Sequence, residues 1–192
     1  MKVLFPNSFY SLITPPNKEE IFKALKTAKV NVEASKEIKW NRHCQVEVGF
    51  LSIKEMGELF IPTLDLFLNE LGMNVRLPLQ FEGIWKNTYR KGGFQETHEH
   101  PDVDLSGCFF LEEDSHPDTG KFYFYNRHSS ELNSVWRELM DNSPDFNGTD
   151  IWFPEYNVGD IILFPSYMLH GVTSHRLKNP RTTVSFNVKF LK

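Results

Sequence analysis

The stretch from Thr97 to Asp104, THEHPDVD, concentrates side chains that could bind a metal ion. It holds two imidazoles and three carboxylates within eight residues. Side chains at i and i+2 of a strand point to the same face, so His98 and His100 would present their rings side by side. Asp102 has the same parity, although Pro101 could end the strand before it. A set rich in imidazole and without thiolate suits Fe, Zn, Cu or Ni.

A second stretch, Gly159 to His170, could supply the third ligand seventy residues after His100. Two ligand sets are open. One is His98, His100 and His170. The other is His100, Asp102 and His170, a facial triad that leaves positions on Fe(II) for a cosubstrate and oxygen. Against both stands a simpler interpretation, in which the pair lies on the surface and His170 is a core residue. We expect the other histidines on the surface or in loops: His43, His116, His128 and His175.

Arg181 begins the third element that could do chemistry, the stretch RTTVSFN. Arg181 and Thr183 share one face of the expected strand. Burying a guanidinium inside a barrel is costly unless the group meets an anion. Arg181 could therefore bind a carboxylate bidentately, with the Thr183 hydroxyl adding a hydrogen bond. Because Pro180 precedes it, the alternative is a solvated arginine at the start of the strand.

Short strands must position these side chains. From Leu79 onward the apolar pattern has a period of two, and Trp85, Asn87 and Tyr89 fall on one side of their strand. Several short strands at roughly ten-residue spacing are typical of a sandwich or barrel. The expected strands are Phe81–Tyr89, Phe94–His100, Leu105–Leu111, Lys121–Tyr125, Ile151–Phe153, Asp160–Phe164, Leu169–Thr173 and Arg181–Phe190.

Helices are expected around this all-β core. One begins at Asn17 and another near Ser52, each with a glutamate three residues later in the manner of a capping box. Pro62 should kink or split the second helix. A third helix is expected over Ser130 to Met140, followed by a polar loop. Inserts of this kind often line the mouth of a site, so we expect it to influence substrate choice.

Length and composition indicate an ordinary globular protein. The 192 residues suffice for one domain. We expect residues 1–78 to supply N-terminal strands and supporting helices, and residues 79–192 to form the core. The net charge of -4 argues against an extended nucleic-acid surface. Cys44 and Cys108 have no CxxC partner and fit a reducing compartment. Without a long apolar run or a signal-peptide pattern, we expect a cytoplasmic protein that does not contact membranes.

The motifs together resemble the Fe(II)- and 2-oxoglutarate-dependent oxygenases, and within them a group common in marine phages and bacteria. That group shows a W-x-N-x-Y strand, H-x-H-P, a Leu-Ser-Gly strand, a Gly-Asp-apolar-Phe-Pro-Ser run with a histidine, and R-x-S-x-S-F-N. Here the motifs stand at Trp85–Tyr89, His98–Pro101, Leu105–Gly107, Gly159–His170 and Arg181–Asn187. The resemblance covers roughly Phe81 to Phe190, and it is specific because five motifs occur in order.

The resemblance implies a double-stranded β-helix, the cupin-like jelly roll, with flanking helices. It also implies a single Fe(II) bound by two residues of the first motif and by His170. The wider superfamily uses H-x-D/E as its first motif, whereas this group often shows H-x-H-P with no acid following. The group pattern favours His98 and His100, with Asp102 as the substitute for His98.

The resemblance further implies 2-oxoglutarate as cosubstrate. Arg181 would bind its distal carboxylate beside the Thr183 hydroxyl, where the group has serine, and Tyr89 is a further candidate for this pocket. If the enzyme is encoded by a phage, it would act in the cytoplasm of the host cell.

The activity expected from the resemblance is a dioxygenase, a hydroxylase that couples oxidative decarboxylation of 2-oxoglutarate to oxidation of an unidentified small-molecule or peptide substrate. Two rival functions use the same fold. A cupin-type metal enzyme without 2-oxoglutarate would not need Arg181. A non-catalytic jelly-roll binding module would use its histidines structurally. Fold alone does not decide among the three.

Overall fold

A computed structural model describes residues 8–38, 42–73, 78–113, 115–127, 138 and 150–191. The strands are β1 Ser11–Ile13, β2 Gln45–Val48, β3 Leu79–Tyr89, β4 Gln95–His98, β5 Leu105–Glu112, β6 Phe122–Tyr125, β7 Ile151–Trp152, β8 Ile161–Pro165, β9 His170–Val172 and β10 Arg181–Phe190. The helices are α1 Lys18–Thr27, α2 Val32–Lys36 and α3 Ile53–Glu70. Every strand expected from Phe81 onward is present, with its ends shifted by two residues at most.

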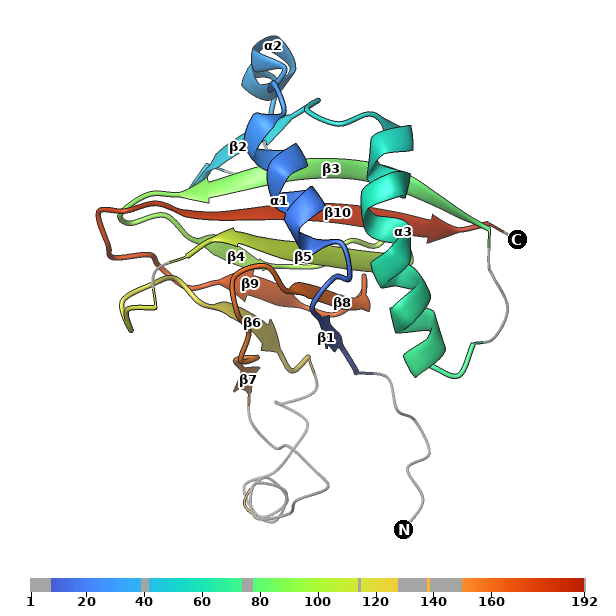
Figure 1. The fold of residues 1–192 in the computed structure, drawn as a ribbon. Coiled ribbons are helices and arrows are strands. Elements are labelled where there is room, and N and C mark those ends of the chain that lie inside the picture. Colours follow the sequence, from blue (N-terminus) through green and yellow to red (C-terminus); the bar gives the residue numbers. More distant parts are fainter. Residues whose placement is uncertain are drawn as a thin grey trace.

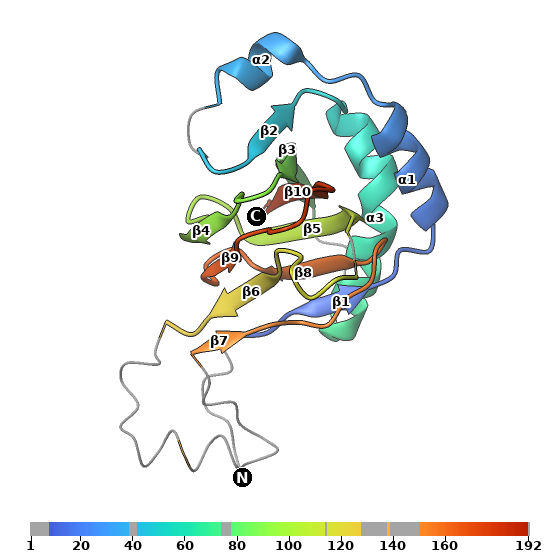
Figure 2. The same cartoon turned by 90° about the vertical axis from the view of Figure 1, so that its left-hand side faces the viewer.

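Two antiparallel sheets form the body of the molecule (Figure 1). The larger sheet has the order β1-β8-β5-β10-β3-β2, and the smaller has the order β4-β9-β6-β7. Figure 2 shows the two sheets as separate layers, with α1 and α3 on the outer side of the larger one. An all-β core of two facing sheets with flanking helices is the jelly-roll architecture that the family resemblance implies.

The middle of the larger sheet is buried on both faces. In β5, Phe109 and Leu111 belong to the apolar cluster on the helix side, whereas Phe110 belongs to the cluster between the two sheets. The residues of β8 alternate between the same two clusters. Successive strand side chains point to opposite faces, so a strand segment with apolar packing on both sides is apolar at consecutive positions. This explains the continuous apolar runs at residues 108–111 of β5 and residues 161–164 of β8.

Helix α3 covers the outer face of the larger sheet with one apolar stripe. Phe60, Leu64 and Phe67 are buried there. The helix begins with the expected capping box. The Ser52 hydroxyl accepts from the backbone N–H of Glu55, and the Glu55 carboxylate accepts from the backbone N–H of Ser52. Pro62 lies inside a continuous helix and does not split it.

Helix α1 begins at the expected place but without the expected cap. Asn17 precedes it and makes no side-chain capping bond to the helix. Its amide instead donates to the carbonyl oxygen of Leu59 in α3, at 3.0 Å. The prediction of a capping box here is wrong because the side chain is used in a contact between the two helices.

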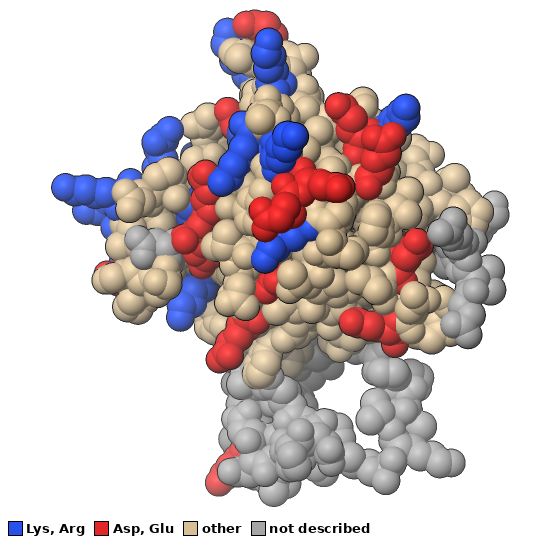
Figure 3. Space-filling view, in the orientation of Figure 1, with Lys and Arg blue, Asp and Glu red and all other residues tan. Residues whose placement is uncertain are grey.

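The N-terminal segment completes the larger sheet. β1 pairs antiparallel with β8, and β2 pairs antiparallel with β3. The helix expected over Ser130 to Met140 and the loop after it lie outside the described residues, except for Glu138 and the end of the loop. None of the helices in the described ranges is long and apolar enough to cross a membrane. Acidic and basic side chains are interspersed over the face that carries α1 and α3 (Figure 3).

Candidate metal centre

Three histidines from the smaller sheet and the turn beside it come together between the two sheets. His98 ends β4 and His170 begins β9, and the two residues are partners in the strand register. His100 follows two residues after β4, and its backbone N–H donates to the carbonyl oxygen of Ser166 at 2.9 Å. One ring nitrogen of each histidine lies within 4.8 Å of the others. This is the ligand arrangement that a single metal ion requires.

Backbone hydrogen bonds orient two of the three rings. Nδ1 of His98 lies 2.8 Å from the carbonyl oxygen of Glu96, and Nδ1 of His170 lies 2.8 Å from that of Met168. A carbonyl oxygen can only accept, so Nδ1 carries the proton in both rings and donates. The lone pair of each neutral ring is therefore on Nε2. A hydrogen bond of this kind on the far nitrogen is usual for histidines that bind metals.

Burial keeps all three imidazoles neutral. It lowers the pKa of His98, and it lowers the pKa of His100 to about 4 with a smaller contribution from the neighbouring His98. The pKa of His170 lies well below its ordinary value, again chiefly because the ring is buried. Only a neutral imidazole has a lone pair for a metal, so protons compete weakly with a metal here near neutral pH. The donor set therefore fits a divalent transition metal.

The acidic residues of the first motif lie outside this cluster. Asp102 is exposed in the turn that follows Pro101. Glu99 forms an ion pair with Arg127. β4 ends at His98, and the chain turns before Asp102 instead of continuing as a strand. The i, i+2 spacing brings His98 and His100 into one cluster, and the turn over Pro101 and Asp102 prevents it from including Asp102.

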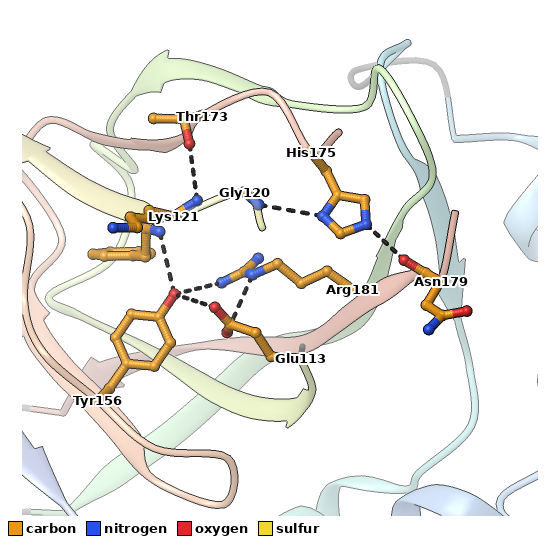
Figure 4. Close-up of polar contacts among 9 residues, drawn as sticks. Glu113, Gly120, Lys121, Tyr156, Thr173, His175, Asn179 and Arg181 are labelled. Carbon is orange, nitrogen blue, oxygen red and sulfur yellow. Dashed lines mark hydrogen bonds and ion pairs between the residues drawn. The ribbon is translucent and has the colours of Figure 1, made fainter. Parts of the chain in front are cut away.

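Arg181 is completely buried at the start of β10, which excludes the solvated alternative. Its Nε donates to a carboxylate oxygen of Glu113 at 3.3 Å, and its Nη2 donates to the hydroxyl oxygen of Tyr156 at 3.2 Å (Figure 4). Its Nη1 is buried without a hydrogen-bond partner among the described residues. Buried donors are nearly always paired, so this unused edge of the guanidinium calls for an acceptor.

An interior pocket joins the histidines to the surroundings of Arg181. Tyr89 and Thr183 line it together with His98, His100 and His170. Tyr89 also packs against Arg181, whose guanidinium carbon lies 5.4 Å from the centre of the tyrosine ring. The structure thus brings all the residues singled out in the sequence to one pocket or its immediate surroundings, with the exception of Asp102.

Polar residues of β3, β5 and β10 form one wall of this pocket. Asn87 and Ser185 face each other, with the amide nitrogen 3.4 Å from the hydroxyl oxygen. The Ser106 hydroxyl donates to the amide oxygen of Asn187 at 2.9 Å. All four side chains line the pocket. None of the four was predicted from the sequence as a site residue, although the two-residue period that groups Arg181 with Thr183 also includes Ser185 and Asn187.

Other residues around Arg181 had no signal in the sequence. Glu113 follows β5, and Tyr156 lies in the segment between β7 and β8. His175, expected on the surface or in a loop, lies in the loop before β10 but is completely buried. Its Nδ1 accepts from the backbone of Gly120, and its Nε2 donates to the carbonyl oxygen of Asn179 (Figure 4). His175 thus connects two loops beside Arg181.

The chain matches one protein family in sequence and several solved structures in fold. Residues 83–187 match the family described as "Putative 2OG-Fe(II) oxygenase". Among solved structures, HygX from Streptomyces hygroscopicus with nickel and 2-oxoglutarate bound aligns with a TM-score of 0.58 at 11% identity, covering 96% of this chain and 84% of that one. A Pseudomonas putida prolyl-4-hydroxylase aligns with a TM-score of 0.57 at 15% identity, covering 95% and 93%.

A third structural neighbour is the viral collagen prolyl hydroxylase vCPH from Paramecium Bursaria Chlorella virus-1, in its 2-oxoglutarate complex. It aligns with a TM-score of 0.57 at 11% identity, covering 95% of this chain and 97% of that one. At such identities these likenesses show the shared jelly-roll fold. No curated protein matches the sequence.

Proposed function

The chain belongs to the family of 2-oxoglutarate- and Fe(II)-dependent oxygenases, and on this premise we propose that it is a hydroxylase acting on a small molecule or a peptide. Membership of the family establishes the enzyme class and the cofactors, Fe(II) and 2-oxoglutarate. The observation that carries the rest is the placement of three neutral, convergent histidines in one pocket with the residues that flank Arg181.

His98, His100 and His170 are the proposed ligands of Fe(II). His98 and His170 would bind through Nε2, because Nδ1 of each ring carries a proton and donates a hydrogen bond to a backbone carbonyl oxygen. Iron with 2-oxoglutarate supplies the activation of oxygen that is coupled to decarboxylation of the cosubstrate. Three neutral ligands leave the charge of the cation uncompensated, so the site favours an anionic cosubstrate. The exposed Asp102 would take no part.

Arg181 is the proposed partner of the distal carboxylate of 2-oxoglutarate. Its Nη1 edge has no other partner among the described residues, and the Thr183 hydroxyl lines the same pocket. Tyr89 packs against the guanidinium and would help to hold it in place. Phe122 and Phe164 line the pocket beside His170 and would exclude water from the reacting atoms.

Structural neighbours suggest what kinds of substrate this fold accepts. HygX has been crystallised with hygromycin B, and two other neighbours are prolyl hydroxylases. These names concern those proteins, and they support only the broad choice of a small molecule or a peptide for this chain.

We also propose a single domain over residues 1–192. In this proposal, residues 1–78 support a core formed by residues 79–192. The pairing of β1 with β8 and of β2 with β3 favours this assignment.

An anaerobic titration of the protein with Fe(II) and 2-oxoglutarate tests the proposed site. We expect a weak visible charge-transfer band that requires both components and disappears in the His170→Ala variant. A protein that binds iron but forms no band would favour a cupin-type enzyme without 2-oxoglutarate. Failure to bind iron would favour the non-catalytic binding module. The exposed His116 offers a matched control, because its replacement by alanine should leave the band unchanged.

Substrate oxidation needs a separate test. Release of succinate from 2-oxoglutarate by the iron-loaded enzyme should rise above its basal rate when the correct small molecule or peptide is added. Mass spectrometry of that compound should then show the gain of one oxygen atom. Stimulated succinate release with an unoxygenated product would contradict hydroxylation and point to another oxidation.

A further inference from the structure

Arg181, Glu113 and Tyr156 form a closed ring of hydrogen bonds deep in the protein. Nε of Arg181 donates to one carboxylate oxygen of Glu113, and its Nη2 donates to the Tyr156 hydroxyl. The tyrosine hydroxyl in turn donates to the other carboxylate oxygen of Glu113 at 3.2 Å. Figure 4 shows the three side chains converging from β10, the end of β5 and the segment before β8.

The surroundings hold this ring in one arrangement. Tyr156 stacks on Phe110 with 3.6 Å between ring centres and an angle of 3° between the planes. Its hydroxyl also lies 3.4 Å from the backbone nitrogen of Phe122, which donates to it. The side chain of Arg181 is 0% exposed and that of Glu113 is 15% exposed. Because the buried arginine and the packed tyrosine both donate to Glu113, we expect its carboxylate to stay beside Arg181 when a second anion arrives.

A cosubstrate carboxylate at Arg181 would create an uneven balance of charge. One guanidinium would then face two carboxylates, that of Glu113 and that of the cosubstrate, in a place with little solvent. Like charges brought together in such a site disfavour each other's ionised form. The two carboxylates can share one cation only at reduced affinity, or after one of them takes up a proton.

We propose that Glu113 is a positioning residue that sets the affinity for 2-oxoglutarate, by competing with the distal carboxylate for the charge of Arg181 and by taking up a proton when the cosubstrate binds. This inference rests on the proposed function, because it assumes that Arg181 binds the cosubstrate. It differs from a purely structural role for Glu113, in which the carboxylate only holds the arginine in place.

The groups that face Glu113 support proton uptake. Burial raises the pKa of this carboxyl group above its ordinary value, and the facing Arg181 and Tyr156 lower it in part. His175 from the loop before β10 and Cys108 on β5 also lie within electrostatic range of this carboxyl group. A dianionic cosubstrate would add a further negative charge and raise the pKa again. The affinity of the wild-type protein should therefore increase as the pH falls.

The Glu113→Gln variant separates competition from positioning. Glutamine retains the size of the side chain and an oxygen that can accept from Nε of Arg181, but it removes the charge. If Glu113 competes, this variant should bind 2-oxoglutarate about tenfold more tightly, as expected when one like-charge contact is removed at a high effective dielectric. If Glu113 acts only by holding Arg181, the variant should bind as the wild type does or more weakly.

Calorimetric titration of 2-oxoglutarate into the anaerobic Fe(II)-loaded protein tests the proposal. The titration is repeated in buffers of different ionisation enthalpy, which counts the protons taken up. We measure wild type, Glu113→Gln and, as a matched control, Glu112→Gln. Glu112 is the adjacent exposed residue, and its carboxylate accepts from the Thr182 hydroxyl at 3.1 Å rather than from Arg181. Measurements stay between about pH 6.5 and 8.5, above most histidine protonation.

The proposal predicts tighter binding by Glu113→Gln, proton uptake by the wild type and by Glu112→Gln, and none by Glu113→Gln. Unchanged or weaker binding by Glu113→Gln, or binding to wild type without proton uptake, overturns it and leaves the proposed function intact. The wild-type proton count needs no variant, so the test holds even where Glu113→Gln fails to fold. A wild type that binds no 2-oxoglutarate contradicts the proposed function itself, and an Arg181→Ala variant that binds it equally well contradicts the proposed role of Arg181.

Discussion

The ring of His98 lies 4.3 Å from the ring of His170, centre to centre, and the two residues are partners across β4 and β9. This contact joins two residues that are 72 positions apart in the chain. It exists because β9 pairs with β4. A change in this pairing register would separate the two rings and turn successive side chains to the opposite face.

Replacement of His98 and of Asp102 distinguishes the two ligand sets that the sequence leaves open. His98→Ala should reduce Fe(II) affinity by about a hundredfold or more, because a site of three protein ligands loses one. Asp102→Ala should change the affinity little, since the side chain is exposed and outside the histidine cluster. Calorimetric titration with Fe(II) under anaerobic conditions, or with Ni(II) in air, measures both. The opposite ranking would restore the triad of His100, Asp102 and His170.

The buried ion pair of Arg181 and Glu113 predicts strong coupling between the two residues. Arg181→Ala should destabilise the protein by roughly 3–5 kcal/mol, because it leaves a buried carboxylate without its partner. The double variant Arg181→Ala with Glu113→Gln should be more stable than the single Arg181→Ala variant, since the unpaired charge is then absent. Urea unfolding of wild type, both single variants and the double variant gives the coupling energy. Additive effects of the two changes would show that the pair contributes nothing.

Gly107 is required by the ring of Phe186. A Cβ atom at this position would lie 2.3 Å from a ring carbon of the completely buried Phe186. Gly107→Ala should therefore destabilise the protein by about 1–3 kcal/mol, the usual range for overpacking a core. Gly83→Ala is the control on β3 of the same sheet, where the atom nearest to the added Cβ would be 4.0 Å away. Equal unfolding midpoints for the two variants in urea would show that the core yields at no cost.

The thiol of Cys44 should react slowly in the folded protein. Burial raises its pKa to about 12, so the reactive thiolate is scarce at mildly alkaline pH. Iodoacetamide near pH 8.5 should modify Cys44 far more slowly in buffer than in urea, where the pKa returns to the ordinary value for a thiol, about 8.5. Peptide mass spectrometry measures the rates. The pKa of Cys44 is higher in the folded protein than in the unfolded chain. The free energy of unfolding should therefore fall as the pH rises above about 8.5, where the thiol of the unfolded chain ionises. Equal rates in both conditions would contradict the burial of this thiol.

Much of the site follows from local patterns in the sequence. The two-residue period places His98 with His100, Arg181 with Thr183, and Asn87 with Tyr89, because side chains in a strand alternate between its faces. The family resemblance then orders these strands and assigns the fold, which the two facing sheets confirm. Period and order are properties of the chain itself, so they could be found without coordinates.

The rest depends on contacts between distant segments. Whether Asp102 joins the histidines depends on the turn after His100, where parity no longer applies. The partners of Arg181 are 68 and 25 residues away in the sequence, at Glu113 and Tyr156, and no local pattern relates them. Packing of β5, β10 and the segment before β8 brings them together. The sequence by itself determined which side chains share a strand face. Only the tertiary structure decided which faces meet, because strand pairing and loop packing are long-range properties of the fold.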